Sequence, residues 1–315
     1  MAIYLDNGNV KELVDISDAI RAVETGLLSQ GLGRAVNEPR HRLKTESSGI
    51  QILLGGDDSK DILGFKAAFY AGGSVNVFLY DTKIKKLVAV IEAGLLGAMR
   101  TGAASAVATK YMARPNSSSL GIIGTGSQAI TQVQAICSEF KIDTILVYSR
   151  DKNNRAKFAD YMKKTMHGSK VVVVDSANEA AKADIITTAT RSEVPVLEGK
   201  WLEKGTHINA IGSNSIIKRE IDLEVVRRSD LIVIDDRVQG AIECGDLLEA
   251  WEIGLVDRNR MIELGDVVSS KNKLRNSADD ITLFESQGIG LWDISFAKTI
   301  YDLAIEKGKG VGLPF

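Results

Sequence analysis

Apolar and polar positions in residues 15–28 repeat with the period of a helix. Asp15 or Ser17 suits the N-cap, and the glycines of Gly31-Leu32-Gly33 suit the stop. An amphipathic helix is therefore predicted over residues 15–28. Its apolar face consists of Ile16, Ala19, Ile20, Val23 and Leu27.

Short apolar runs with strand-like composition follow, and glycine pairs or an Asp-Thr-Lys turn separate them. They predict an antiparallel sheet in a first domain. Residues 93–113 then predict a long helix rich in alanine and glycine, whose small side chains allow close packing against a neighbour. The predicted strands occupy residues 50–54, 63–70, 75–80 and 87–91.

Residues 120–148 contain an apolar run, a Gly-x-Gly-x-x-Ala turn, a helical segment over 130–140 and a second apolar run. This order predicts a nucleotide-binding βαβ unit. Gly124 permits the tight turn, and Gly126 lets a pyrophosphate approach the backbone at the positive end of the helix. The turn supplies the candidate cofactor-binding residues Gly124, Thr125, Gly126, Ser127 and Gln128.

Strand-like and helix-like segments alternate beyond this unit. Because the strand segments are almost continuously apolar, they predict a parallel sheet that is covered on both faces. The fold class is therefore α/β, with a Rossmann doubly wound sheet in residues 116–285. A smaller α+β domain is predicted in residues 1–115, completed by 286–315, where an amphipathic helix over 293–307 is expected to return to it. The polar segment 114–119 is the predicted boundary. The alternating segments are strands at 171–174, 184–189, 207–211 and 231–234 and helices at 177–182 and 222–228.

Composition narrows the function classes. The 315 residues are 44% hydrophobic and 25% charged with a net charge of −2, which suits about two globular domains and offers no basic surface for nucleic acid. The two cysteines, Cys137 and Cys244, are far apart, so neither a disulfide framework nor a metal site is expected. No run of about 18 apolar residues and no leader pattern are present. A cytoplasmic protein without a membrane partner is expected.

The end of the second strand in the βαβ unit bears on cofactor choice. An acidic residue there would bond the ribose hydroxyls and repel a 2′-phosphate, but this chain has Ser149-Arg150. Arg150 can pair with a 2′-phosphate and stack on adenine. NADP(H) is therefore favoured, with NAD(H) as the alternative if Arg150 is only a surface residue ahead of a helix that starts at Asp151.

Three cations stand in unusual surroundings. Lys66 is the only charge in residues 62–70, and Arg100 is the only ionisable side chain in residues 93–109. An unpaired buried ammonium costs several kcal/mol, so Lys66 must reach solvent, find a carboxylate or bind an anionic ligand. With Arg42 as a third cation, these residues predict a pocket for a substrate carboxylate. The alternative is that each is a solvated or helix-capping side chain.

The combined motifs resemble the ornithine cyclodeaminase and mu-crystallin family over nearly the whole chain. That resemblance implies homodimers built through the first domain's sheet and a site between the two domains. Known activities in the family are ornithine cyclodeamination, alanine dehydrogenation and reduction of ketimines such as pyrroline-2-carboxylate. The motifs are Lys66 and the segments 100–105, 121–129, 207–212 and 281–286.

The resemblance also assigns roles. Lys66 resembles the lysine that binds the substrate carboxylate and assists proton transfer, and Arg100 resembles a carboxylate-binding arginine. Arg42 looks like the third cation, with Arg40 as the alternative. The resemblance implies cofactor contacts at Thr101, Gln128 and Thr190. The three histidines, His41, His167 and His207, are expected to be structural.

Two departures from the family pattern bear on the substrate. Asn214 stands where ornithine cyclodeaminase has an aspartate, and Ile52 stands where it has a glutamate. Loss of both acids argues against a diamine, although Asn214 remains a candidate substrate contact. The predicted function is NAD(P)H-dependent reduction of a small α-imino acid, or the reverse dehydrogenation. The alternatives are ornithine cyclodeamination with bound NAD and non-catalytic ligand binding of the mu-crystallin type.

Overall fold

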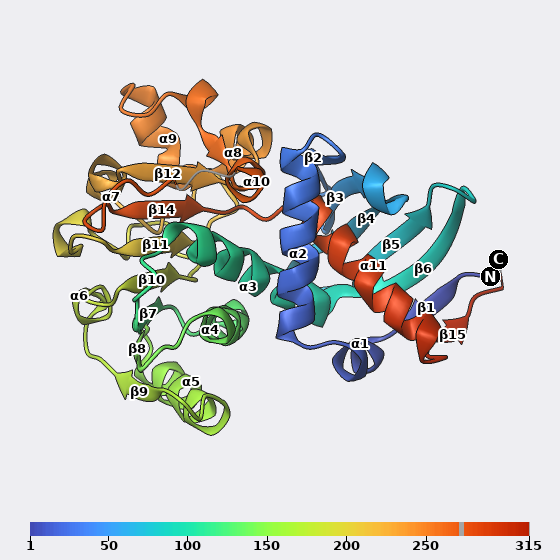
Figure 1. Cartoon of the computed structure of the whole chain (residues 1–315), viewed down its shortest axis with the longest axis horizontal. Coiled ribbons are helices and arrows are strands. Elements are labelled where there is room, and N and C mark those ends of the chain that lie inside the picture. Colours follow the sequence, from blue (N-terminus) through green and yellow to red (C-terminus); the bar gives the residue numbers. More distant parts are fainter. Residues whose placement is uncertain (271–273, 315) are drawn as a thin grey trace. The chain divides into compact units, whose positions relative to one another are not determined.

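Two compact units make up the computed structural model, which describes residues 1–270 and 274–314. Unit 1 comprises Met1–Ala104 and Ile289–Phe315, and unit 2 comprises Ser105–Gly288. Each unit contains one sheet (Figure 1). The α/β fold class that was predicted is confirmed, with a parallel sheet in unit 2 and a separate, mainly antiparallel sheet in unit 1.

Unit 1 is built on a sheet in the order β15-β1-β6-β5-β4-β3-β2. Strands β2 to β6 are antiparallel neighbours, and β1 runs parallel to β6. The predicted strands correspond to β3, β4, β5 and β6, whereas β2 was not foreseen because its sequence is polar and contains a proline. The bounds are β1 (Ile3–Leu5), β2 (Ala35–Lys44), β3 (Gly49–Asp57), β4 (Ile62–Phe69), β5 (Val75–Asp81), β6 (Lys86–Glu92) and β15 (Val311–Gly312).

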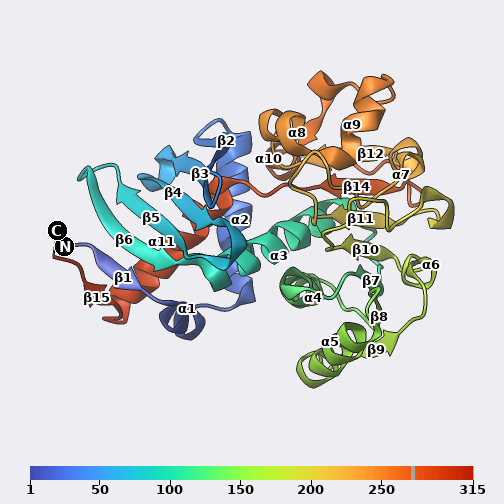
Figure 2. The same cartoon turned by 180° about the vertical axis from the view of Figure 1, so that it is seen from behind.

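Two long helices cover one face of this sheet. Helix α2 (Ile16–Gly31) and helix α11 (Gly290–Glu306) pack on each other, and α11 lies across β3 and β4 (Figures 1 and 2). The contact of α11 with β3 is close because Gly55 of β3 faces Gly290 of α11, where added Cβ atoms would approach backbone atoms to 2.6 Å and 2.4 Å. Helix α1 (Asn7–Leu13) lies between β1 and α2 in the chain.

Unit 2 holds eight parallel strands in the order β13-β12-β14-β11-β10-β7-β8-β9. The sequence order reverses at β7, which lies between β8 and β10, and ligands bind α/β sheets at such switch points. Strand β14 was missed by sequence analysis. The bounds are β7 (Ser119–Ile123), β8 (Thr144–Tyr148), β9 (Lys170–Val173), β10 (Ile185–Thr188), β11 (His207–Ala210), β12 (Leu231–Ile234), β13 (Ile262–Glu263) and β14 (Thr282–Glu285).

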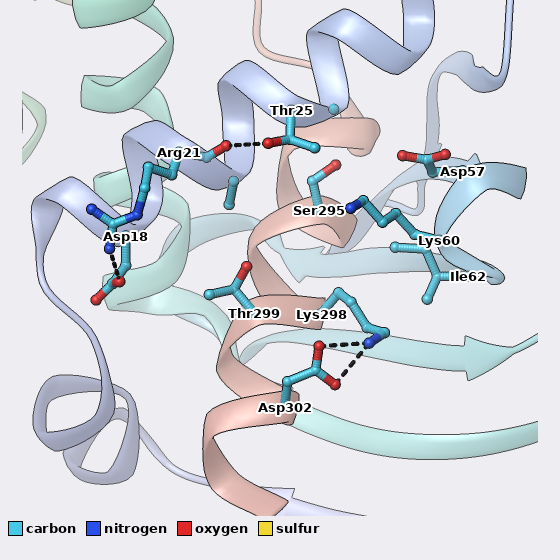
Figure 3. Close-up of a pocket in the computed structure, with 12 residues that line it drawn as sticks. Asp18, Arg21, Thr25, Asp57, Lys60, Ile62, Ser295, Lys298, Thr299 and Asp302 are labelled. Carbon is cyan, nitrogen blue, oxygen red and sulfur yellow. Dashed lines mark hydrogen bonds and ion pairs between the residues drawn. The ribbon is translucent and has the colours of Figure 1, made fainter. Parts of the chain in front are cut away.

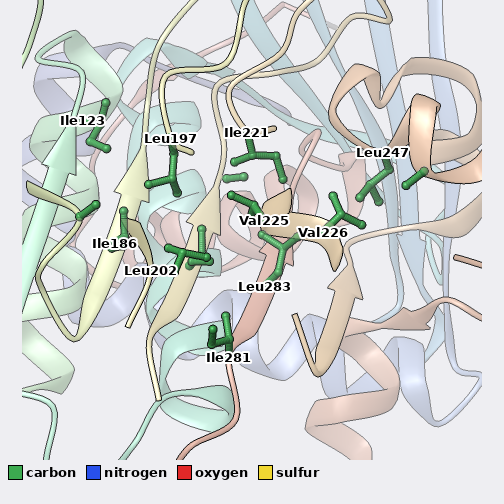
Figure 4. Packing of buried hydrophobic residues seen from close by; sticks show 14 of the residues in the cluster. Ile123, Ile186, Leu197, Leu202, Ile221, Val225, Val226, Leu247, Ile281 and Leu283 are labelled. Carbon is green, nitrogen blue, oxygen red and sulfur yellow. The ribbon is translucent and has the colours of Figure 1, made fainter. Parts of the chain in front are cut away.

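Apolar cores lie on both faces of the parallel sheet. Ile185 belongs to one core and its neighbour Ile186 to the other, as expected when successive side chains alternate between faces. Figure 4 shows Ile186, Leu197 and Leu283 in one of these cores. The helices are α4 (Ser127–Glu139), α5 (Lys152–Thr165), α6 (Ala177–Ala180), α7 (Leu223–Arg228), α8 (Arg237–Glu243), α9 (Gly245–Glu252) and α10 (Leu264–Ser269).

The boundary between the units lies within α3 (Ala93–Met112), after Ala104, and the chain leaves unit 2 after Gly288. Sequence analysis placed the first boundary in the polar segment 114–119. That segment belongs to unit 2, because the backbone N–H groups of Ser118 and Ser119 donate to Asp184 at 2.9 and 3.1 Å. A continuous helix gives no change of composition by which such a boundary could be seen.

None of the helices in the described part of the chain is long and apolar enough to cross a membrane.

Replacing Gly290 with alanine tests the close approach of α11 to β3. The added Cβ would lie 2.4 Å from the Leu54 carbonyl oxygen, so we expect Gly290→Ala to lower the free energy of unfolding by about 1–3 kcal/mol. Gly94→Ala is the matched control, because its Cβ would only touch the Asn7 amide at 3.4 Å. Urea unfolding of both variants measures the difference, and equal midpoints would contradict the packing described.

Candidate active site

Lys66 lies on the face of β4 that the helices cover, with 6% of its surface exposed. Its Nζ is 2.9 Å from both carboxylate oxygens of Asp293 in α11. Of the three fates that the sequence allowed for this buried ammonium, pairing with a carboxylate is therefore the one observed.

Arg100 of α3 is held by the same carboxylate. Its Nε donates to Asp293 Oδ1 at 3.0 Å, and its guanidinium lies 5.7 Å from the centre of the Trp292 ring. Its Nη1 is buried and has no hydrogen-bond partner among the described residues. Because a buried donor without an acceptor is costly, this nitrogen is suited to receive an anionic ligand.

Lys66 and Arg100 share the single carboxylate of Asp293. Asp293 is fully buried and faces two cations. The positive charge of Arg40 also acts on Lys66. Burial and the Arg100 and Arg40 charges lower the pKa of Lys66 to about 7, although Asp293 opposes them. The amine therefore changes its protonation state near neutral pH, as a proton-transfer group must.

The structure favours Arg40 over Arg42 as the third cation. Arg40 is 9% exposed and its Nη1 donates to Gln51 Oε1 at 3.3 Å, whereas Arg42 is exposed. The pairing register of β2 and β3 shifts between Glu38 and His41. Such a bulge redirects side chains, and this local event is not visible in the sequence pattern.

In unit 2, Gly124 closes the turn after β7. Its φ is +108°, and an added Cβ would lie 2.4 Å from the Ala189 carbonyl oxygen. Its N–H donates to the Tyr148 carbonyl at 2.9 Å. The turn therefore rests on the ends of β8 and β10, and only glycine fits there.

The N-terminus of α4 is open to an anion. Gly126 is its N-cap without a side-chain cap bond, and no heavy atom of the described chain lies within 4 Å of an added Cβ. By contrast, aspartates cap α5 and α8. Gln128 has a buried side-chain oxygen, Oε1, without a partner among the described residues, and as an acceptor it suits a donor group of a ligand and not a phosphate oxygen. Thr125 is half-buried and Ser127 exposed, and the whole turn fits the pyrophosphate of a dinucleotide.

Glu220, which sequence analysis missed, fixes the loops after β10 and β11. Its carboxylate accepts bonds from Thr190 N and Oγ1 at 2.5 and 2.6 Å, from Thr188 Oγ1 at 2.9 Å and from the Gly212 N–H at 2.6 Å. Burial raises the pKa of Glu220, and these four donors oppose that effect. The hydroxyl proton of Thr190 is thus already used within the protein.

The remaining candidates are placed as follows. Asn214 Oδ1 accepts from Lys218 Nζ at 3.1 Å. Ser149 Oγ donates to the Asp151 carbonyl at 3.3 Å, and Arg150 is exposed at the end of β8. In unit 1, Thr101 Oγ1 donates to the Gly97 carbonyl at 2.8 Å.

His207 is buried within unit 2. Its ring nitrogens lie 2.9 Å from Thr282 Oγ1 and 3.2 Å from Asn209 Oδ1. Burial lowers the pKa of His207 to about 3, so the ring stays neutral at ordinary pH. Its bond to Thr282 ties β11 to β14, which is consistent with the structural role expected of His207.

A separate cavity of about 310 Å³ lies on unit 1 among α2, β4 and α11 (Figure 3). Lys298 pairs there with Asp302 at 2.6 Å, and Arg21 pairs with Asp18. These ion pairs lie within single helices, which satisfies both cations without a ligand. The cavity is therefore a weaker candidate than the buried cluster at Lys66.

The structure thus brings Lys66 and Arg100 together on Asp293, a residue that sequence analysis treated only as a helix start, and places Arg40 near enough for its charge to act on Lys66. An isolated acid in the apolar run Gly290-Leu291-Trp292 to Ile294 was the available signal, because it mirrors the isolated cations. Glu220 sits in a polar segment and gave no comparable signal.

Comparison with known proteins gives consistent results. A Delta(1)-pyrroline-2-carboxylate reductase of Bacillus cereus is 36% identical over 241 residues, 76% of this chain and 74% of the relative. The structure of the Thermococcus litoralis Delta(1)-pyrroline-2-carboxylate reductase in complex with NADH and L-proline matches with a TM-score of 0.93 and 34% identity, covering 99% of this chain and 100% of that one. An archaeal alanine dehydrogenase dimer with bound NAD matches with a TM-score of 0.92 and 30% identity, covering 100% and 99%.

The sequence profile of the ornithine cyclodeaminase/mu-crystallin family matches residues 3–308, which is nearly the whole chain. The motif-based resemblance is thereby confirmed, and the chain belongs to the ornithine cyclodeaminase/mu-crystallin family.

Proposed function

We propose that this protein is a nicotinamide-dependent oxidoreductase that reduces a small α-imino acid, or oxidises the corresponding amino acid in the reverse direction. The observation that carries the proposal is the buried group of Lys66 and Arg100, which has more positive than negative charge and an unpartnered Arg100 Nη1. Relatives named as reductases of an imino acid support the same chemistry.

Each residue of the proposed site has a role that follows from its chemistry. Arg100 and Arg40 bind the substrate carboxylate, and Lys66 gives a proton to the imine nitrogen and regains one from water. A nicotinamide dinucleotide held at the α4 turn would supply the hydride that this reaction requires. One hydride and one proton convert the imine to the amine, so the reaction balances.

We further propose that NADP(H) is preferred. The two residues directly after β8 are Ser149 and Arg150, neither of which is acidic, and the exposed guanidinium of Arg150 can reach a 2′-phosphate. Asp151 is the nearest acid, but its side chain is occupied in capping α5 through the Asn154 N–H at 2.8 Å.

The surroundings of Asn214 disfavour a diamine substrate. The amide oxygen of Asn214 holds the ammonium of Lys218, so a cation stands beside the position where ornithine cyclodeaminase has its aspartate. A second ammonium on the substrate would be repelled there. The reductase is therefore preferred to ornithine cyclodeamination. The retention of several buried cations in one place speaks against non-catalytic ligand binding.

A homodimer is proposed through the sheet of unit 1. The face opposite α2 and α11 carries Phe65 and Phe78, whose rings stack with centres 4.8 Å apart, and the 48% exposed Leu63 and Phe69. An apolar sheet face of this kind is suited to a second copy of the chain. The archaeal alanine dehydrogenase relative is a dimer.

The reaction and its pH dependence can be tested together. We expect the protein to consume NADPH or NADH with pyrroline-2-carboxylate, piperideine-2-carboxylate, or pyruvate plus ammonia. Because Lys66 must be protonated to donate, kcat/KM for reduction should fall as the pH rises through about 7, and oxidation should rise. Lys66→Met should lower kcat/KM at least about 100-fold, measured by the absorbance of the reduced nicotinamide.

Lys298→Met is the control, because Lys298 lies on α11 with its ammonium paired to Asp302. Turnover by Lys66→Met within a few-fold of the parent would refute the role of Lys66. Proline formed from ornithine without added nucleotide would establish cyclodeamination instead, and dinucleotide binding without turnover of any substrate would favour a ligand-binding protein.

Cofactor preference is tested at Arg150. Losing a charge-assisted bond to the 2′-phosphate should raise the KM for NADPH by roughly 10–100-fold in Arg150→Ala and leave the KM for NADH within about twofold. Lys157→Ala, an exposed charge removal on α5, should change neither constant. A parent enzyme with a lower KM for NADH than for NADPH would overturn the preference.

The proposed dimer is tested by placing a charge on the apolar sheet face. Phe78→Lys would bury an unpaired ammonium in the interface, so we expect a monomer by light scattering coupled to size-exclusion chromatography. Val173→Lys alters a 43% exposed residue of β9 in unit 2 and should leave the oligomer unchanged. If the Phe78→Lys variant keeps the parent's mass, the interface lies elsewhere.

A further inference from the structure

We propose that Asp293 is a positioning residue: it orients Arg100 so that the outer guanidinium nitrogens take a planar monocarboxylate, and it holds the Lys66 ammonium as the proton donor. This inference rests on the proposed function, because it concerns how the same residues are arranged for it. Asp293 would act through its two partners, without touching the substrate.

The position of Asp293 suits a carboxylate that stays charged. It lies in the first turn of α11, where no side-chain cap is present in the described chain, and the helix macrodipole favours negative charge there. It is fully buried, and both of its oxygens face Lys66 Nζ at 2.9 Å. Burial and the contacts with Lys66 and Arg100 therefore fix the position of this carboxylate.

Arg100 has only part of its guanidinium available. Asp293 occupies Nε, and Trp292, the neighbour of Asp293 on α11, lies against the guanidinium. The buried Nη1 remains without a partner among the described residues. Since a carboxylate binds guanidinium most strongly through two parallel bonds, the substrate is directed to the pair of Nη nitrogens.

Lys66 and Arg100 approach the same stretch of α3. Lys66 Nζ lies 3.9 Å from the position of a Cβ on Gly97, one turn before Arg100. The absence of a side chain at Gly97 leaves this ammonium room beside the helix. A carboxylate held by Arg100 therefore lies on the same side of α3 as the proton donor.

The charge of Asp293 also controls when Lys66 holds its proton. Burial lowers the pKa of Lys66, as do Arg100 from α3 and Arg40 from β2, and Asp293 from α11 raises it. Removing the negative charge leaves only the lowering influences. Lys66 would then lose its proton at a lower pH, and the acid form required for reduction would be depleted near neutrality.

The test compares Asp293→Asn with Asp302→Asn, a control on the same helix whose side chain pairs with Lys298. In Asp293→Asn we expect the falling limb of the kcat/KM profile to move to lower pH by about one unit or more, and kcat near neutral pH to fall roughly tenfold. At a pH below the shifted limb, where Lys66 is protonated in both proteins, KM should change less than about threefold, because the amide oxygen still accepts from Arg100 Nε. Asp302→Asn should retain the parent profile.

Asp293→Glu separates charge from position and serves if the asparagine variant does not fold. Because the variant keeps a carboxylate, the falling limb of its kcat/KM profile should stay at the parent's pH. The added methylene displaces Arg100 and should lower kcat/KM about tenfold or more. A glutamate variant with the parent's kcat/KM would overturn the positioning role. So would an Asp293→Asn profile that superimposes on the parent's after correction for the folded fraction.

Binding of pyrrole-2-carboxylate, a planar carboxylate that accepts no hydride, gives a readout independent of turnover. Calorimetry on the dinucleotide-loaded protein should show affinity declining as Lys66 loses its proton, and the decline should begin at lower pH in Asp293→Asn. If no imino acid is reduced but this shift is seen, the proposed function fails and the positioning role stands. Identical pH dependence in both proteins overturns the positioning role whatever the turnover.

Discussion

One buried carboxylate holds the candidate site together. Asp293 lies between the Lys66 ammonium and the Arg100 guanidinium inside unit 1, where neither cation is more than 6% exposed. Without it, two desolvated positive charges would repel each other, which is a strongly destabilising arrangement. The packing of α11 on the sheet therefore depends on the same ion cluster that prepares the site for an anion.

Much of the fold and part of the site followed from local sequence. The Gly124 turn has a length, a spacing and neighbouring apolar runs that only a strand-turn-helix arrangement satisfies. Lys66 and Arg100 were visible because each is a single charge within an apolar run, and burial makes such a charge conspicuous. The structure bears out their burial, while their roles toward a substrate stay predictions.

What the sequence left open depends on contacts between distant residues. Asp293 lies 227 positions from Lys66, and Glu220 joins loops from two strands, so no local pattern shows which residues either one contacts. Whether Arg40 or Arg42 is the buried cation depends on the register shift in β2, and this shift arises from the pairing of β2 with β3. The polar strand β2 was likewise missed, because an edge strand needs no apolar pattern.

The uncapped start of α4 has a consequence for the protein's lifetime. Most helix ends in a folded chain are satisfied by the chain itself, but here the missing acceptor must come from solution. A bound dinucleotide would therefore stabilise the folded protein. The melting temperature and the resistance to proteolysis would rise with the concentration of that metabolite. Cells poor in it would hold less of this protein, independently of any effect on catalysis.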